Sequence, residues 1–181
     1  MMGRSSVGGC VAVLGFLMLA GVGGAPAMAD GFEIGFDIGY IDFDGDIARD
    51  SELRYDVRAG YFFNRSFQIE LQLIRASGDL DTELTTVMIN SVSSLRPQKT
   101  LDPYVLVGIG YAQLDLDTLD GTESFSDEDL AYQVGLGLRW DVGEVTGLGV
   151  RFEVSLLSEE TFGGASNHVN ALVGLTWQFG R

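Results

Sequence analysis

The chain has 181 residues, and its 26 acidic residues outnumber its 11 basic residues, which gives a formal net charge of −15 at pH 7. This balance excludes a nucleic-acid-binding protein with a basic surface, and a hydrophobic content of 46% excludes a disordered acidic tail. Cys10 is the only cysteine and His168 the only histidine, so disulfide frameworks, cysteine metal clusters and multi-histidine sites lack the necessary residues.

Residues 1–29 have the pattern of an export signal. Arg4 provides a positive start, an uncharged and mostly apolar run follows from Val7 to Ala25, and Ala27-Met28-Ala29 offers a small-x-small cleavage site. We therefore expect a helical signal peptide over 1–29 and one domain over 30–181. A retained membrane anchor is the alternative, because the apolar run approaches the ~20 residues that span a bilayer.

After the predicted signal, apolar and polar residues alternate with a period of two, which predicts β-strands. Eight segments of this kind occur, and only the fourth leaves open which of its faces is apolar. The segments are 32–40, 53–63, 67–73, 83–95, 105–112, 130–140, 148–156 and 169–179.

The connections between these segments alternate in length. Short turns follow the second, fourth and sixth segments, and longer polar stretches follow the other four, at 42–51, 75–82, 114–129 and 158–167. Membrane-spanning up-and-down barrels have this arrangement, with short turns on the periplasmic side and longer loops outside.

The two faces of the strands differ in side-chain size. One face is built from large apolar residues, and the other mostly from glycine, alanine, serine, glutamine and charged residues. The interior of an eight-stranded barrel is only wide enough for side chains to fill it, so the bulky face must point outward. We therefore predict an all-β protein, an eight-stranded antiparallel up-and-down transmembrane β-barrel. A β-sandwich and a soluble exported barrel around an apolar ligand are the alternatives.

Aromatic residues on the apolar face are sorted by depth. Such residues are typical of the two membrane–water interfaces, so we predict two aromatic girdles. The periplasmic girdle contains Phe32, Phe63, Phe67, Trp140, Trp177 and Phe179, and the outer girdle contains Tyr40, Tyr55, Tyr111 and Tyr132.

Three segments of the chain resemble a known family. PYVLVGIGYAQ (103–113), AYQVGLGLRW (131–140) and VGLTWQF (173–179) are similar to the small outer-membrane β-barrel family, which includes the OmpA transmembrane domain and the opacity-type surface proteins. The resemblance covers the whole predicted barrel. It implies a location in the outer membrane of a Gram-negative cell envelope and insertion from the periplasm by the barrel-assembly machinery.

Charged residues on the polar face predict an ion-pair network inside the barrel. Five acids and four bases nearly cancel in charge, and buried charges are tolerable only when they are paired. We interpret this set as a structural plug, with a gated narrow ion path as the alternative. Its members are Glu33, Asp37, Arg54, Asp56, Arg58, Glu70, Arg139, Arg151 and Glu153.

Most of the remaining acidic residues lie in the predicted loops. Asp42-Phe43-Asp44-Gly45-Asp46 and Asp115-Leu116-Asp117 cluster carboxylates as calcium sites do, but neither has the spacing of an EF-hand. We interpret these residues as solvated loop charge and predict no metal site and no cofactor. The expected partners are outer-membrane lipid and lipopolysaccharide, with a possible extracellular ligand at the acidic loops.

These observations favour a monomeric, non-enzymatic surface barrel with a structural or surface-interaction role. A low-conductance porin-like channel is the first alternative. A lipid-modifying barrel enzyme is the second and less favoured one, because it needs a nucleophile beside a general base. The candidate groups for such an enzyme are Ser155 and Ser166 near His168, with Glu153, Glu159 or Glu160.

Overall fold

A computed structural model describes residues 31–43, 52–77, 82–97, 99–117, 124–142, 147–161 and 164–180. The predicted signal peptide lies outside these residues, so its boundary at 29 stays a prediction. The described residues include no helix that is long and apolar enough to cross a bilayer.

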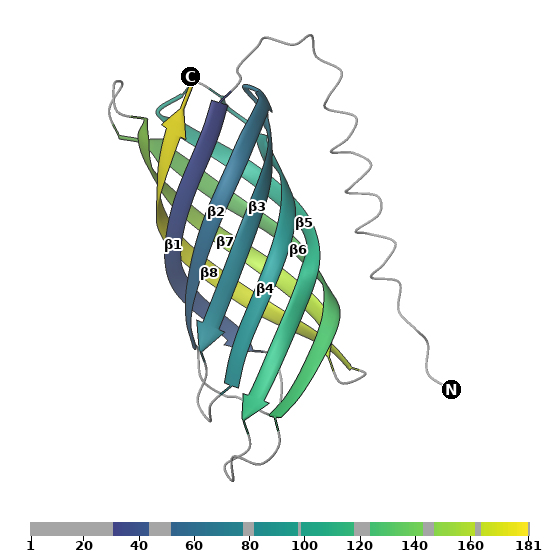
Figure 1. Ribbon diagram of the computed structural model, residues 1–181. Helices are drawn as coiled ribbons and strands as arrows, with labels where there is room; N and C mark the ends of the chain where they lie inside the picture. Colours follow the sequence, from purple (N-terminus) through teal and green to yellow (C-terminus); the bar gives the residue numbers. More distant parts are fainter. Residues whose placement is uncertain are drawn as a thin grey trace.

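The described residues form a closed barrel in which each strand pairs antiparallel with the next, and β1 pairs with β8 (Figure 1). This confirms the predicted eight-stranded up-and-down topology. The strands are β1 (Gly31–Phe43), β2 (Glu52–Asn64), β3 (Phe67–Ser77), β4 (Thr82–Ser94), β5 (Leu101–Asp117), β6 (Ser124–Asp141), β7 (Leu148–Thr161) and β8 (Gly164–Phe179).

We call the end at which β1 begins and β8 ends the turn end, and the opposite end the loop end. The turn end is at the top of Figure 1, where β2, β4 and β6 end and β3, β5 and β7 begin.

The strands are steeply tilted. A path from Gly31 that crosses each strand at the paired residue returns to β1 at Ile41, 10 residues further along. With a rise of ~3.3 Å per residue and a strand spacing of ~4.8 Å, this shift gives a tilt of roughly 40° from the barrel axis. A barrel of this size has an interior that side chains fill.

Several strands are longer at the loop end than the sequence predicts. β5 continues to Asp117, β6 starts at Ser124, and β7 and β8 approach each other at Thr161 and Gly164. The contrast between long and short connections is therefore smaller than expected. A backbone ladder needs no continuous apolar face once it has left the lipid, so stretches rich in acidic residues and serine can extend these strands.

The fourth strand has apolar residues on both faces, which explains why its phase is unreadable in the sequence. Val87 and Ile89 are exposed on the outward face. Leu84, Met88 and Val92 are buried and point inward.

The outward face is a continuous apolar surface. Twenty-nine large hydrophobic residues of the described chain are exposed, from Phe32 at the turn end to Tyr111 at the loop end. All ten predicted girdle residues are on this face. At the turn end, Tyr61 joins them through contacts with the rings of Phe32 and Phe63, whose centroids are 5.2 and 4.9 Å from its own.

Candidate functional site

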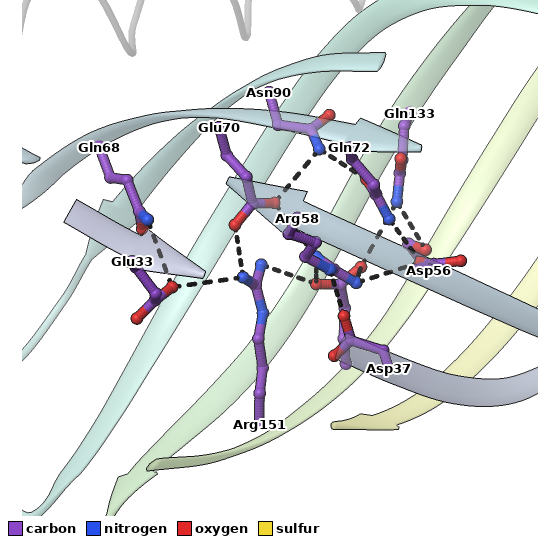
Figure 2. A network of polar contacts seen from close by, with 12 residues as sticks. Glu33, Asp37, Asp56, Arg58, Gln68, Glu70, Gln72, Asn90, Gln133 and Arg151 are labelled. Atoms are coloured by element: carbon purple, nitrogen blue, oxygen red, sulfur yellow. Dashed lines mark hydrogen bonds and ion pairs between the residues drawn. The ribbon is translucent and has the colours of Figure 1, made fainter. Parts of the chain in front are cut away.

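Arg58 of β2 lies at the centre of the charged groups inside the barrel (Figure 2). Its guanidinium is 2% exposed and donates to Asp37, to Glu153 (2.9 Å) and to Glu70 (3.2 Å), with a longer contact of 3.4 Å to Asp56. These four carboxylates come from β1, β7, β3 and β2. One arginine therefore ties together four strands across the lumen.

Arg151 of β7 forms a second centre beside the first. It donates to Glu70 (2.6 Å) and Glu153 (3.0 Å), so it shares two carboxylates with Arg58. Its Nε also donates to the hydroxyl of Tyr104, which in turn donates to Glu153 (2.9 Å). The guanidinium carbon lies 4.5 Å from the centroid of the Tyr104 ring, a cation–π distance.

Arg139 of β6 holds the group nearest the turn end. It donates to Glu33 and to Gln68, both at 3.0 Å, and its guanidinium lies over the rings of Phe62 and Tyr104 at 5.5 and 5.6 Å. Glu33 also accepts from Gln178 (2.8 Å), and Asp102 is 3.9 Å from Arg139.

Arg54 of β2 lies toward the loop end and forms a fork-like pair with Asp56, with two contacts of 2.7 Å. Paired guanidinium and carboxylate groups of this geometry give the strongest hydrogen bonds of the protein repertoire. Asp56 also accepts from Gln72 (2.6 Å), and Gln72 accepts from Asn90 (2.6 Å). Amides thus connect the ion pairs to β3 and β4.

Glycines give these large side chains their space. A Cβ on Gly137 would collide with the ring and hydroxyl of Tyr104, and a Cβ on Gly174 would collide with the Asp37 carboxylate. Both glycines point inward in the strand alternation, so they serve as recesses in the barrel wall.

The structure brings all nine of the predicted charged residues together inside the barrel, each 3% exposed or less. Sequence reasoning missed Asp102, which adds a sixth buried carboxylate to the four arginines and changes the sum of formal charges from −1 to −2. It also missed the aromatic and amide members of the network. They are Phe62, Tyr104, Gln68, Gln72, Asn90, Gln133 and Gln178.

The groups considered for an enzyme do not form a catalytic arrangement in the described part of the chain. Ser155 is 2% exposed and accepts from Gln133 (3.0 Å), and Glu153 is held by two arginines. His168 pairs in register with Leu157, so it lies diagonally from Ser155 and not opposite to it. The side chains of Ser166, Glu159 and Glu160 lie outside the described residues.

No group of three or more His, Cys, Asp or Glu side chains within the described ranges is arranged to hold a metal ion. The two acidic stretches considered for calcium lie outside those ranges or have side chains that the structure does not describe.

A family model for the outer membrane protein beta-barrel domain matches residues 12–179. The chain belongs to this family. Its location is therefore the outer membrane, and the exposed apolar face of the barrel contacts lipid. The match confirms the resemblance carried by the segments 103–113, 131–140 and 173–179. A comparison with curated protein sequences finds no match.

Several solved structures share the fold at low sequence identity. Neisserial surface protein A (NspA) superposes with a TM-score of 0.72 at 12% identity, and the match covers 82% of this chain and 97% of that one. OprG of Pseudomonas aeruginosa gives 0.59 at 13% identity, with 84% and 97% covered. Ail, the attachment invasion locus protein of Yersinia pestis, gives 0.56 at 14% identity, with 84% and 100% covered. Ail has also been solved with the heparin analogue sucrose octasulfate.

Proposed function

We propose that this outer-membrane barrel is non-enzymatic and closed to solutes, and that it has a structural or surface-interaction role through its acidic loops. The observation that carries the proposal is the network centred on Arg58 and Arg151. Ten charged side chains from six strands pair with one another inside the lumen, and each of them is 3% exposed or less. A wide diffusive channel needs a water-filled interior.

The burial of these groups supports a closed state. An unpaired ion inside a protein carries a large desolvation cost, so charges stay buried only where partners replace water. Arg58 and Arg151 together make seven contacts of 3.4 Å or less to carboxylates. Opening the lumen at this level requires several of these contacts to break at once.

The composition of the loops supports a role at the cell surface with cationic partners. Fifteen acidic residues lie in the polar stretches predicted as loops, including Asp42, Asp44, Asp46 and Asp50 in the first. Ail was solved with a polyanion, sucrose octasulfate. Loops of this sign repel a polyanion, so we expect this chain to bind divalent cations that bridge it to lipopolysaccharide, or a basic protein surface.

The surroundings of the candidate catalytic groups support a non-enzymatic role. A lipid substrate approaches from the outward face or the loops, but Ser155 and Glu153 point into the lumen and are buried there. Neither group has a route to a lipid acyl chain in the closed barrel.

A low-conductance channel is the second candidate, and buried polar atoms without partners favour it. Among the described side chains these include both amide atoms of Asn170, Nη1 of Arg54 and Oε1 of Gln133. Water inside the lumen would satisfy such groups, and a file of water molecules is the first requirement of an ion path.

The test is electrical recording from the refolded chain in planar lipid bilayers. Folding is first checked by heat-modifiable gel mobility, and the location by fractionation of expressing cells. We expect a folded band in the outer-membrane fraction and no current steps above the bare bilayer. Discrete steps from the folded wild-type chain contradict the closed lumen and favour the channel.

A further inference from the structure

We infer that a buried apolar cluster near the loop end, and not the ion-pair network, is the barrier that stops ions in the lumen. This inference rests on the proposed closed lumen and says which part of it closes. The cluster is defined by Ile41, Ile74, Ala76, Leu84, Met88, Ala112, Ala131 and Leu157. We call it the apolar layer.

The apolar layer extends across most of the interior. Its members come from six of the eight strands (β1, β3, β4, β5, β6 and β7), and none is more than 4% exposed. They point to the lumen and form one cluster, and Ile41 of β1 belongs to it although neither of its neighbouring strands, β2 and β8, contributes a member, so the contacts reach beyond adjacent strands. The sequence predicted small or polar residues on this face, and the structure places a packed apolar contact there.

The apolar layer lies between the network and the loops. On β1, Ile41 follows Asp37 toward the loop end, and on β7, Leu157 follows Glu153 in the same direction. The register gives the same order on β3, where Ile74 and Ala76 come after Glu70. An ion that enters from the loop side therefore meets the apolar layer before it meets Arg58 or Arg151.

Several buried polar or charged residues of the described chain lie in register with members of the apolar layer, including Arg54 with Ala76, Thr86 with Ile74 and Ala112, His168 with Leu157, and Asn170 with Ile41. Arg54 pairs in register with Ala76 and with Gly39, and its guanidinium is turned onto Asp56 at the network side. Its Nε and Nη2 are thus bonded to a carboxylate on the network side, and Nη1 is the one guanidinium nitrogen of Arg54 without a hydrogen-bond partner among the described residues.

The two regions differ in how they can respond to an entering ion. The groups of the network can exchange a hydrogen bond with each other for one with water or an ion, so they can accommodate a charged species. Alkyl side chains cannot replace the water molecules that hydrate an ion. Apolar constrictions in channels stop conduction by excluding water. The apolar layer is therefore the stronger barrier, and the main role of the network is to hold the strands together.

The test compares two triple variants that remove the same bulk but differ in polarity. The first is I41S/I74S/L157S, and its matched control is I41A/I74A/L157A. Apolar cavities inside proteins stay dry, whereas polar ones take up water. In planar bilayers we expect the serine variant to give current steps about tenfold above the wild-type background and the alanine variant to stay near that background.

A third variant, R58A/E153A, removes one bonded pair of the network without changing the net charge. We expect its current to stay at the wild-type background while its resistance to unfolding decreases. The inference is overturned if folded R58A/E153A conducts and the folded serine variant does not, or if both conduct equally. A conducting wild-type chain would instead contradict the proposed closed lumen, so the two failures are distinguishable.

Thiol accessibility provides a measurement that tolerates poor folding of the triple variants. The domain 30–181 has no cysteine, so M88C places a single thiol in the apolar layer and S66C places one in an exposed turn. We expect a cationic methanethiosulfonate reagent to modify S66C at once and M88C only after unfolding in urea. Rapid modification of M88C in the folded barrel overturns the inference, because it shows that hydrated cations reach the layer.

Discussion

The outward and inward faces of the eight strands arise from one alternating pattern but depend on different properties of their residues. On the outward face, Leu136 is 66% exposed and its partner is lipid, so any apolar side chain of moderate size serves. On the inward face, Arg58 has four named carboxylate partners within 3.4 Å. The outward face therefore tolerates apolar residues of different shape but no charged residue. The inward face tolerates a charged residue only where its ion-pair partners are present, and it tolerates little change in side-chain shape.

The largest expected effect is the removal of one network arginine. Arg58→Ala leaves Asp37, Glu70 and Glu153 facing a cavity, and breaking a buried ion pair from one side costs about 3–5 kcal/mol. The free energy of unfolding is measured by urea titration in lipid vesicles, with the fluorescence of Trp140 and Trp177 as the signal. Arg75→Ala removes an arginine from the outward face and is the control, with an expected change of about 0.5 kcal/mol. Equal costs for the two variants contradict the comparison.

A charge in the middle of the outward face tests the other half of the comparison. Leu136 lies midway between Tyr132 and Trp140, so Leu136→Arg places a cation near the centre of the lipid and should cost about 2–4 kcal/mol in the same titration. The matched change Val142→Arg lies beyond the girdle and should cost about 0–1 kcal/mol. A cost that does not depend on depth would mean that this face does not contact lipid.

A single methyl group tests the shape requirement of the inward face. Gly137→Ala forces the new Cβ against the ring of Tyr104 and should cost about 1–3 kcal/mol through overpacking. In a Tyr104→Leu background the same change should cost less, because the ring that blocks it is gone. Additive costs in the double-mutant cycle would show that the two sites do not interact.

The smallest effect is a shape change at constant volume on each face. Leu106→Ile on the buried face should cost about 1 kcal/mol, and Leu175→Ile on the lipid face should stay within about 0.5 kcal/mol. The two variants are compared by the urea concentration at the midpoint of unfolding, with equal slopes of the two transitions. A larger loss at Leu175 reverses the expected order of the two faces.

The period of two was enough to predict the eight strands, their closure and the inward position of the nine charged residues, because each strand has one face in lipid. The pattern did not predict the parts of the strands that extend beyond the lipid at the loop end. The ends of β5 and β6 at the loop side are rich in aspartate, glutamate and serine, and the backbone ladder continues through them to the pair Asp117 and Ser124.

The pattern was equally uninformative about which inward residues meet one another. Asp102 lies next to a turn, and Tyr104 precedes an apolar run, so neither looked like part of a charged network. The pairing of β5 with β6 places both residues, because Asp102 is the register partner of Arg139 and Tyr104 is the register partner of Gly137. The apolar layer escaped notice for a related reason: its members are spread over six strands, one or two to a strand, and only the shear of the sheet brings them to one depth.

The pairing of β1 with β8 has a consequence for how the barrel forms. Phe32 and Phe179 are register partners although nearly the whole domain separates them in sequence, so closure is the most non-local contact of the fold. Until the last strand arrives, the edges of β1 and β7 have unpaired backbone groups, which attract any extended chain nearby. An added peptide with the sequence of β8 should therefore compete for the edge of β1 and trap the unclosed sheet, and it should have no effect once the seam is made.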